Sequence, residues 1–248
     1  LRTPLTSILG YAHILLKHQD LSIWVRETIA TMQSSGEHMR ALIDGSLDLA
    51  RIEAGRLKLD MSSVPLMRLL EDVERMVRPQ AEAKGLHFSL EREGDIPEWI
   101  RGDAKRLRQI LINLLSNAVR FTDAGEVTLR LDFRQQVARL AVVDTGIGIA
   151  PTDQQRIFLP YERGAAGRRN PQTGTGLGLT ITHLLVSMMG GELSLQSTPG
   201  LGTTFTVRLY LPSIGQTQAP VPLLPEMMHR ITGYRPPART LLIVDDQP

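Results

Sequence analysis

Apolar positions recur at intervals of three and four residues through the first fifty residues of the chain. The first run consists of Leu1, Leu5, Ile8, Leu9, Ala12, Leu15 and Leu16. After a polar stretch at residues 17–22, a second run consists of Val25, Ile29, Met32, Gly36, Met39, Ile43, Ser46 and Ala50. Each run predicts one apolar face of a helix, and the second keeps the spacing of a heptad. We therefore expect an antiparallel helical hairpin over residues 1–57.

The two apolar faces raise the question of what covers them. Two helices cannot bury both stripes by packing only against each other, so association with a second copy into a four-helix bundle is expected. Small residues at Gly36, Ser46 and Ala50 let a partner helix approach closely. This favours a homodimer through residues 1–55. An intramolecular hairpin packed on the following domain fits the same periodicity.

Beyond Gly55 the pattern changes to short elements of both periods, which predicts a domain boundary near residues 57–64. Helical spacing marks residues 65–84, 103–119 and 177–189. Alternation marks strands at residues 86–91, 127–133, 137–143, 191–197 and 203–211. Strands and helices without strict alternation predict an α+β class, here an α/β sandwich with a mixed sheet over residues 62–212.

The last part of the chain has a different composition. Residues 213–239 are rich in proline with little periodicity, which predicts an extended linker. Residues 240–248 begin with a Leu and β-branched run that ends in Asp245 and Asp246, as the first strand of a further domain would. Because Leu1 opens inside a helical pattern, we expect a piece of a longer protein.

Composition excludes several classes of function. The 28 Lys and Arg nearly balance the 26 Asp and Glu, and they form no basic cluster, so no nucleic-acid partner is expected. Without cysteine there is no disulfide, thiolate zinc site or thiol nucleophile. The longest uncharged stretch, residues 170–191, carries Gly, Thr and Ser, so we expect no membrane contact in this chain.

Three polar patterns carry candidate chemistry. Asn113 and Asn117 lie four residues apart on one helix face, and their neutral oxygens suit Mg²⁺. Asp144 ends a strand and is followed by Gly146 and Gly148, so its carboxylate could accept a hydrogen bond from an adenine amino group. Residues 174–179 form a glycine-rich helix start, whose backbone N–H groups favour phosphate.

Other nucleotide motifs fit less well. A dinucleotide fingerprint would place its third glycine at Pro151, where we expect no helix to start. No P-loop motif occurs. The long connection at residues 150–173 is of the length that often forms a lid over a ligand.

Together these motifs resemble the sensor histidine kinases of two-component signalling. Residues 1–5 are similar to the end of the H box and residues 113–121 to the N box. Residues 144–149, 158–163 and 174–179 resemble the first glycine box, the F box and the second glycine box. Residues 240–246 are similar to the opening of a receiver domain, which implies a hybrid kinase.

The resemblance implies an ATP site with Mg²⁺. It places Asp144 on the adenine, Asn117 on the metal, Asn113 beside the water and phosphates, and Arg120 where a phosphate-binding Lys is usual. The residues that it implies for the lid and phosphate cradle are Gly146, Gly148, Tyr161, Arg163, Gly174, Thr175, Gly176, Leu177 and Gly178. Tyr161 stands where the family commonly has Phe.

The implied reaction moves the γ-phosphoryl group of ATP to a histidine and then to a receiver aspartate. The family's histidine stands four residues before Thr3, so this chain lacks it. Thr3 matches the position that orients water when a phosphorylated receiver is hydrolysed. The implied partner is a receiver domain, either the protein's own or a separate one. A cytoplasmic location follows, with a longer parent that could be membrane-anchored upstream.

Two other functions fit the same motifs. A nucleotide-sensing scaffold or pseudokinase would bind ATP without autophosphorylation. An ATPase clamp related to gyrase, heat-shock chaperone or mismatch-repair proteins would share the nucleotide fold, but those families usually carry a glutamate where Asn113 stands.

Overall fold

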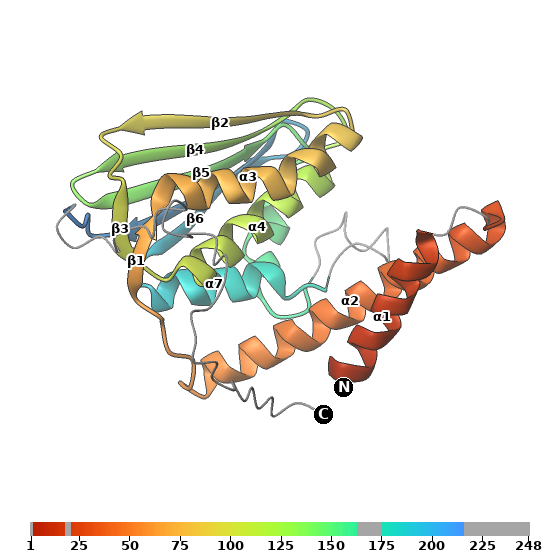
Figure 1. Ribbon diagram of the computed structural model, residues 1–248. Coiled ribbons are helices and arrows are strands. Elements are labelled where there is room, and N and C mark those ends of the chain that lie inside the picture. Colours follow the sequence, from red (N-terminus) through yellow and green to blue (C-terminus); the bar gives the residue numbers. More distant parts are fainter. Residues whose placement is uncertain (1, 18–20, 163–174, 216–248) are drawn as a thin grey trace, which may run out of the picture.

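The computed structural model describes residues 2–17, 21–162 and 175–215. It contains a pair of helices, α1 (Arg2–Leu16) and α2 (Ile23–Glu53), followed by a domain with a mixed sheet. Figure 1 shows this pair beside the sheet domain. The predicted architecture of a helical hairpin and an α+β domain with a mixed sheet is confirmed. Arg163, Gly174 and residues 216–248 lie outside the described part, so the expected linker and receiver start are not described beyond residue 215.

The hairpin is held by close packing of α1 on α2. Ser22 caps α2, because its side chain accepts a hydrogen bond from the backbone N of Val25 at 3.4 Å. Leu5 and Leu9 are buried against α2 at Gly36, where an added Cβ would lie 2.7 Å from the Cδ2 atom of Leu9. Glycine at this position therefore sets the distance between the two helices.

Within the described residues, no helix combines the length and apolar character that crossing a membrane requires.

The main sheet has five strands in the order β2-β4-β5-β7-β6. The strands are β2 (His87–Gly94), β4 (Glu126–Arg134), β5 (Val137–Asp144), β6 (Glu192–Thr198) and β7 (Gly202–Tyr210). β2 runs parallel to β4, and the other neighbours are antiparallel. Alternation in β4 turns Val127, Leu129, Leu131 and Phe133 into the core, as their spacing predicts.

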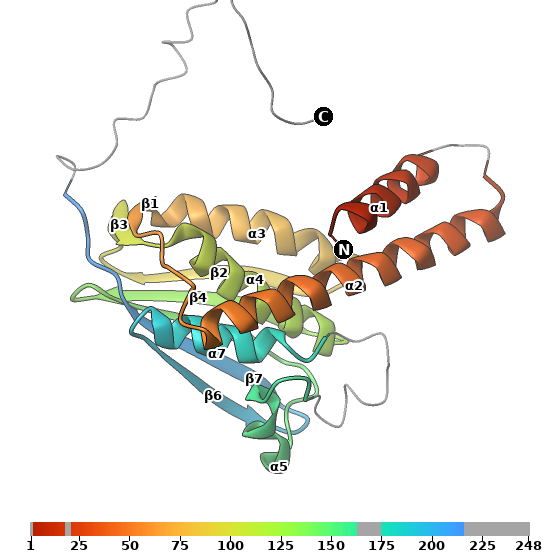
Figure 2. The same cartoon turned by 90° about the horizontal axis from the view of Figure 1, so that it is seen from below.

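Three helices cover one face of this sheet: α3 (Leu66–Ala83), α4 (Ala104–Phe121) and α7 (Gly178–Met188) (Figure 2). Asp103 caps α4 by accepting a hydrogen bond from the backbone N of Arg106 at 3.0 Å. The face of α4 on the sheet consists of Leu107, Ile110, Leu111, Leu114, Leu115 and Ala118. This burial fixes the rotation of α4 and leaves its polar stripe at the edge of the layer.

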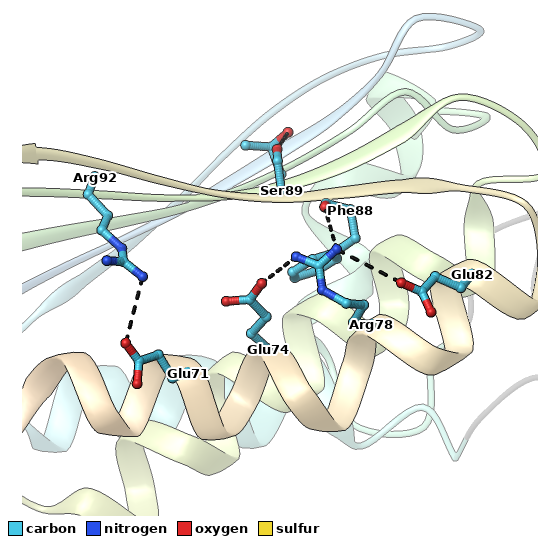
Figure 3. Close-up of polar contacts among 8 residues, drawn as sticks. Glu71, Glu74, Arg78, Glu82, Phe88, Ser89 and Arg92 are labelled. Carbon is cyan, nitrogen blue, oxygen red and sulfur yellow. Dashed lines mark hydrogen bonds and ion pairs between the residues drawn. The ribbon is translucent and has the colours of Figure 1, made fainter.

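Arg78 on α3 fastens the edge strand β2 to the helix layer (Figure 3). Its guanidinium donates to the backbone O of Phe88 at 3.2 Å and lies 5.3 Å from the centre of the Phe88 ring. Glu74 and Glu82 flank it on the same helix. The edge strand is therefore held by polar contacts as well as by burial.

Four short elements were not expected from the sequence. β1 (Ser62–Pro65) and β3 (Trp99–Gly102) form a two-stranded antiparallel sheet. A strand of four residues is too short to be recognised from the alternation of apolar and polar positions. The expectation that no helix starts at Pro151 is wrong, because α5 (Pro151–Gln154) begins there. Proline is compatible with the first turn of a helix, because the backbone N–H that it lacks would have no hydrogen-bond partner within the helix there. A short 3-10 helix, η1 (Arg156–Phe158), follows it.

We expect Gly36→Leu to force α1 away from α2, because the new side chain would occupy the place of Leu9. Overpacking of this kind costs about 1–3 kcal/mol, so the amides of α1 should exchange with solvent faster. Gly10→Ala is the matched control, because a Cβ at this α1 position meets nothing within 4 Å. Equal exchange in α1 for the Gly36→Leu variant and the unmodified chain would contradict this packing.

Candidate functional site

A cavity of about 930 Å³ lies between α2, α4, the turn after β5 and the start of α7. It brings together most of the residues that the sequence singled out. Those lining it are Asn113, Asn117, Arg120, Asp144, Gly148, Thr175, Gly176, Leu177 and Gly178. Gly146 and Tyr161 lie next to this wall without lining it, whereas Thr3 is exposed on α1. Four separate stretches of sequence therefore converge on one cavity.

Asp144 is a buried acid at the end of β5, with 8% of its surface exposed. Its Oδ1 atom accepts hydrogen bonds from the backbone N of Gly146 at 2.9 Å and of Thr203 at 3.2 Å. Burial raises the pKa of Asp144 more than these two bonds lower it. The fold thus holds a carboxylate in the cavity wall at a cost, which is typical of a ligand-binding group.

The turn after Asp144 requires glycine because it packs backbone against backbone. A Cβ on Gly146 would lie 2.3 Å from the backbone O of Phe121, at the end of α4. Gly148 has a φ of +67°, and its Cβ would lie 2.1 Å from the backbone O of Thr198. The turn is therefore wedged between α4 and β6, which fixes the carboxylate that precedes it.

Asn113 packs its amide onto the first turn of α7. Its Nδ2 donates to the Oγ1 atom of Thr182 at 2.8 Å. A Cβ on Gly178 would lie 2.2 Å from the Oδ1 atom of Asn113, so only glycine fits opposite this amide. Gly176, with a φ of +73°, accepts a hydrogen bond from the backbone N of Tyr161 at 3.0 Å. These contacts hold the glycine-rich helix start against α4.

Arg120 supplies positive charge to the cavity. Among the described residues no carboxylate forms an ion pair with it, and burial lowers its pKa. Lys84 donates to the backbone O atoms of Val119 and Arg120, each at 2.9 Å, which satisfies the end of α4. A guanidinium that shares a cavity with the start of α7, and has no ion pair within the described ranges, suits an anionic group such as phosphate.

Sequence reasoning missed the wall that α2 contributes. The lining residues from α2 are Ser34, Glu37, His38, Ala41, Asp44, Gly45 and Asp48. These residues are spaced by three and four positions in the sequence, but the apolar stripe beside them led to the interpretation of α2 as a helix of the hairpin alone. Polar residues on a helix face are usually solvated, so the periodicity alone gives them no partner.

Comparisons with known proteins match both parts of the chain. The model of the His Kinase A (phospho-acceptor) domain matches residues 1–55. The model described as Histidine kinase-, DNA gyrase B-, and HSP90-like ATPase matches residues 102–213.

Individual proteins are also similar to this chain. The autoinducer 2 sensor kinase/phosphatase LuxQ of Vibrio cholerae is 38% identical over 229 residues, which cover 91% of this chain and 27% of LuxQ. The signal transduction histidine-protein kinase BarA of Escherichia coli K12 is 35% identical, over 85% of this chain and 23% of BarA. Full-length ShkA, solved in complex with AMPPNP, aligns with a TM-score of 0.71 and 33% identity, over 86% of this chain and 44% of ShkA. The chain spans about a quarter of the length of these curated relatives.

Asp144 generates a prediction about pH. The pKa of Asp144 is raised in the folded state, so the free energy of unfolding falls as the pH rises from the unfolded-state pKa to the folded-state pKa, and that loss persists at higher pH. There is no such effect at pH values where Asp144 is protonated in both states. Asp144→Asn keeps an acceptor oxygen for Gly146 and Thr203 but carries no charge. We expect this variant to have a larger free energy of unfolding than the unmodified chain at neutral pH, with the difference shrinking as the pH falls.

Urea unfolding at a series of pH values measures this difference. Asp132→Asn, at an exposed ion pair with Arg134, is the control for loss of a surface charge. A destabilised Asp144→Asn variant at neutral pH would show that the two backbone bonds outweigh burial.

Proposed function

The chain belongs to the sensor histidine kinases, and we propose that it binds Mg-ATP and serves transfer of the γ-phosphoryl group to the family's histidine, which stands four residues before Thr3 and is not part of this sequence. The observation that carries the proposal is the single cavity that joins Asp144, Asn117 and Arg120 to α2 of the hairpin. We place the hairpin at residues 1–57, the ATP-binding domain at 62–212, a linker at 213–239 and the start of a receiver domain at 240–248.

The residues of the cavity fit ATP at both of its ends. Asp144 is a buried acceptor of the kind that an adenine amino group needs. The phosphates would lie at the start of α7, where Gly176 and Gly178 keep the backbone open, and near Arg120. ShkA was solved with AMPPNP, an ATP analogue, which supports the same ligand class here.

The donor set also fits Mg²⁺. The described residues contain no group of three or more His, Asp and Glu that could hold a metal ion by themselves. Mg²⁺ is commonly bound through few protein ligands, with phosphates and water for the rest. Asn117 would hold the ion from the cavity wall, and Asn113 is fixed beside it by Thr182. When bound, Mg²⁺ would neutralise charge on the phosphates.

Catalysis by this chain would rest on positioning and charge rather than on a protein nucleophile of the ATP-binding domain. Imidazole needs little activation near neutral pH, because its unperturbed pKa is about 6.5. A bond forms between an imidazole nitrogen and the γ-phosphorus, and the bond to the β-phosphate oxygen breaks, releasing ADP. Arg120 would stabilise the charge that develops on the phosphoryl group.

The phosphohistidine would then donate to a receiver aspartate, from the protein's own receiver domain or a separate one. Relatives such as BarA and LuxQ support this two-component role, and the name of LuxQ includes a phosphatase. Thr3, exposed on α1, would orient water for hydrolysis of the phosphorylated receiver. We propose that these domains act in the cytoplasm. A nucleotide-sensing scaffold is not favoured, because the similar proteins are named as sensor kinases.

The hairpin is proposed to dimerise through its uncovered apolar side chains. The exposed large apolar side chains of the hairpin include Ile8, Tyr11, Ile14, Leu15, Met32 and Met39. The match of residues 1–55 to a His Kinase A domain supports dimerisation. The structure holds one chain, and this surface would otherwise face water at a cost in free energy.

We expect Ile8→Glu combined with Leu15→Glu to convert a dimer into a monomer, because both charges would enter the bundle seam. Sedimentation equilibrium measures the change. Met76→Glu, an equally exposed apolar position on α3, is the control and should leave the dimer intact. A double variant that sediments with the same mass as the unmodified chain would place the dimer interface elsewhere.

Nucleotide titration tests the proposed metal role. We expect Asn117→Ala to weaken ATP binding in the presence of Mg²⁺ by about 10- to 100-fold, because the metal loses its protein ligand. Binding of ATP in excess EDTA should change little. Equal affinity for Mg-ATP in the variant and the unmodified chain would remove Asn117 from the metal site, and equal binding of ATP and GTP by the unmodified chain would remove Asp144 from the adenine site.

A further inference from the structure

One face of α2 is packed on the ATP-binding domain instead of on α1. Leu49 is part of the domain's hydrophobic core. Gly45, one turn earlier, lies against α7, where an added Cβ would be 3.2 Å from the Cδ1 atom of Leu177 and 3.3 Å from that of Ile181. Asp48 lies on the same face, three residues after Gly45. The hairpin and the domain therefore meet along a defined stripe of α2.

Asp48 joins a closed polar ring with two residues of α4. Its Oδ2 atom accepts hydrogen bonds from Gln109 Nε2 at 3.0 Å and from Arg106 Nη1 at 3.4 Å. Arg106 Nη1 also donates to Gln109 Oε1 at 2.7 Å. The side chains of Asp48 and Arg106 are only 20% and 11% exposed. A charge pair this shielded is directional, and losing one partner leaves the other charge unpaired.

The ring is anchored to the frame of the domain. Asp103 Oδ1 accepts from the backbone N of Arg106, and Asp103 Oδ2 accepts from the backbone N of Asp60 at 2.9 Å. The connection between hairpin and domain is thus tied to the same helix start that carries Arg106. Asn113 and Asn117 stand on this helix, two and three turns further along.

We infer that Asp48 is a positioning residue, which sets the register in which the ATP-binding domain docks on the hairpin. This inference rests on the proposed function, because docking in one register matters only if the domain delivers a phosphoryl group to the hairpin. The apolar contact at Gly45 and Leu49 is non-directional and tolerates several registers. The ring with Arg106 and Gln109 is satisfied in one register only. In this way Asp48 would fix the position of the phosphate end of the cavity relative to the hairpin. A displacement of about 1 Å between reacting groups can lower a reaction rate about 100-fold.

Cross-linking measures this register directly. Ser46 Oγ and Tyr161 OH lie 3.5 Å apart across the same junction. The chain has no cysteine, so Ser46→Cys with Tyr161→Cys introduces the only two thiols. Reaction with a short bismaleimide, in the absence of nucleotide, should join the two thiols within one chain. The product is detected as a shift in gel mobility, and a shift that persists at high protein dilution identifies a cross-link within one chain.

We expect Asp48→Ala in this background to slow cross-linking by about tenfold, within the range of measured couplings between buried partners. Glu53→Ala, an exposed acid on the same helix, is the matched control and should cross-link at the parent rate. Exchanging the charges, Asp48→Arg with Arg106→Asp, should restore much of the rate. Restoration assigns the effect to the interaction between the two charges, because neither substitution by itself keeps that ion pair.

An Asp48→Ala variant that cross-links at the parent rate would overturn the inference. If that variant does not fold, Asp48→Asn decides, because it keeps an acceptor for Gln109 but loses the ion pair and should cross-link at an intermediate rate. An Asp48→Asn variant at the parent rate would equally overturn it. ATP titration of the unmodified chain is scored separately: absence of ATP binding would refute the proposed function while the cross-linking rates still report on docking.

Discussion

Burial of one face of α4 against the sheet is the constraint on which the rest of this molecule depends. With that face fixed, Arg106, Gln109, Asn113, Asn117 and Arg120 form a stripe of polar residues along the adjacent face, because they are spaced by three and four residues. The first part of the stripe binds α2, and the later part lines the cavity. One helix therefore carries both the docking contacts and the groups that we propose for nucleotide and metal.

Close contacts at glycine bring the surrounding elements to α4. Gly178 admits the Asn113 amide, and Gly146 lets the turn after β5 reach the end of α4. Gly45 also allows a close approach, between α2 and α7, but a Cβ there would meet only the ends of the Leu177 and Ile181 side chains at 3.2 and 3.3 Å. Side chains at these points would separate the walls of the cavity by the thickness of a methyl group or more. Substitutions at Gly146 and Gly178 would therefore change the shape of the cavity even with every polar group still present.

Much of this arrangement was predictable from the sequence, and the exceptions have physical causes. The spacing of Leu107, Ile110, Leu111 and Leu114 predicted α4 and its buried face, and the alternation in residues 127–133 predicted β4, because burial of one face imposes a period. The two four-residue strands β1 and β3 were missed, since neither is long enough to show a period. The contacts of Asp48 with Arg106 and of Asn113 with Gly178 were also missed, because they join residues more than fifty positions apart and leave no trace in local pattern. The family resemblance suggested the roles that we propose for Asp144 and Asn117, and the structure places both residues in one cavity.

We propose that this chain is the ATP-binding and docking core of a histidine kinase, in which the family places the acceptor histidine four residues before the position of Thr3. The most direct measurement is the intact mass of the protein after incubation with Mg-ATP, for this chain and for one extended upstream through the family's H box. The account predicts an acid-labile phosphoryl increment on the extended chain and none on this chain. An extended chain that binds ATP but gains no phosphoryl group would contradict it, as would an increment of equal size on both.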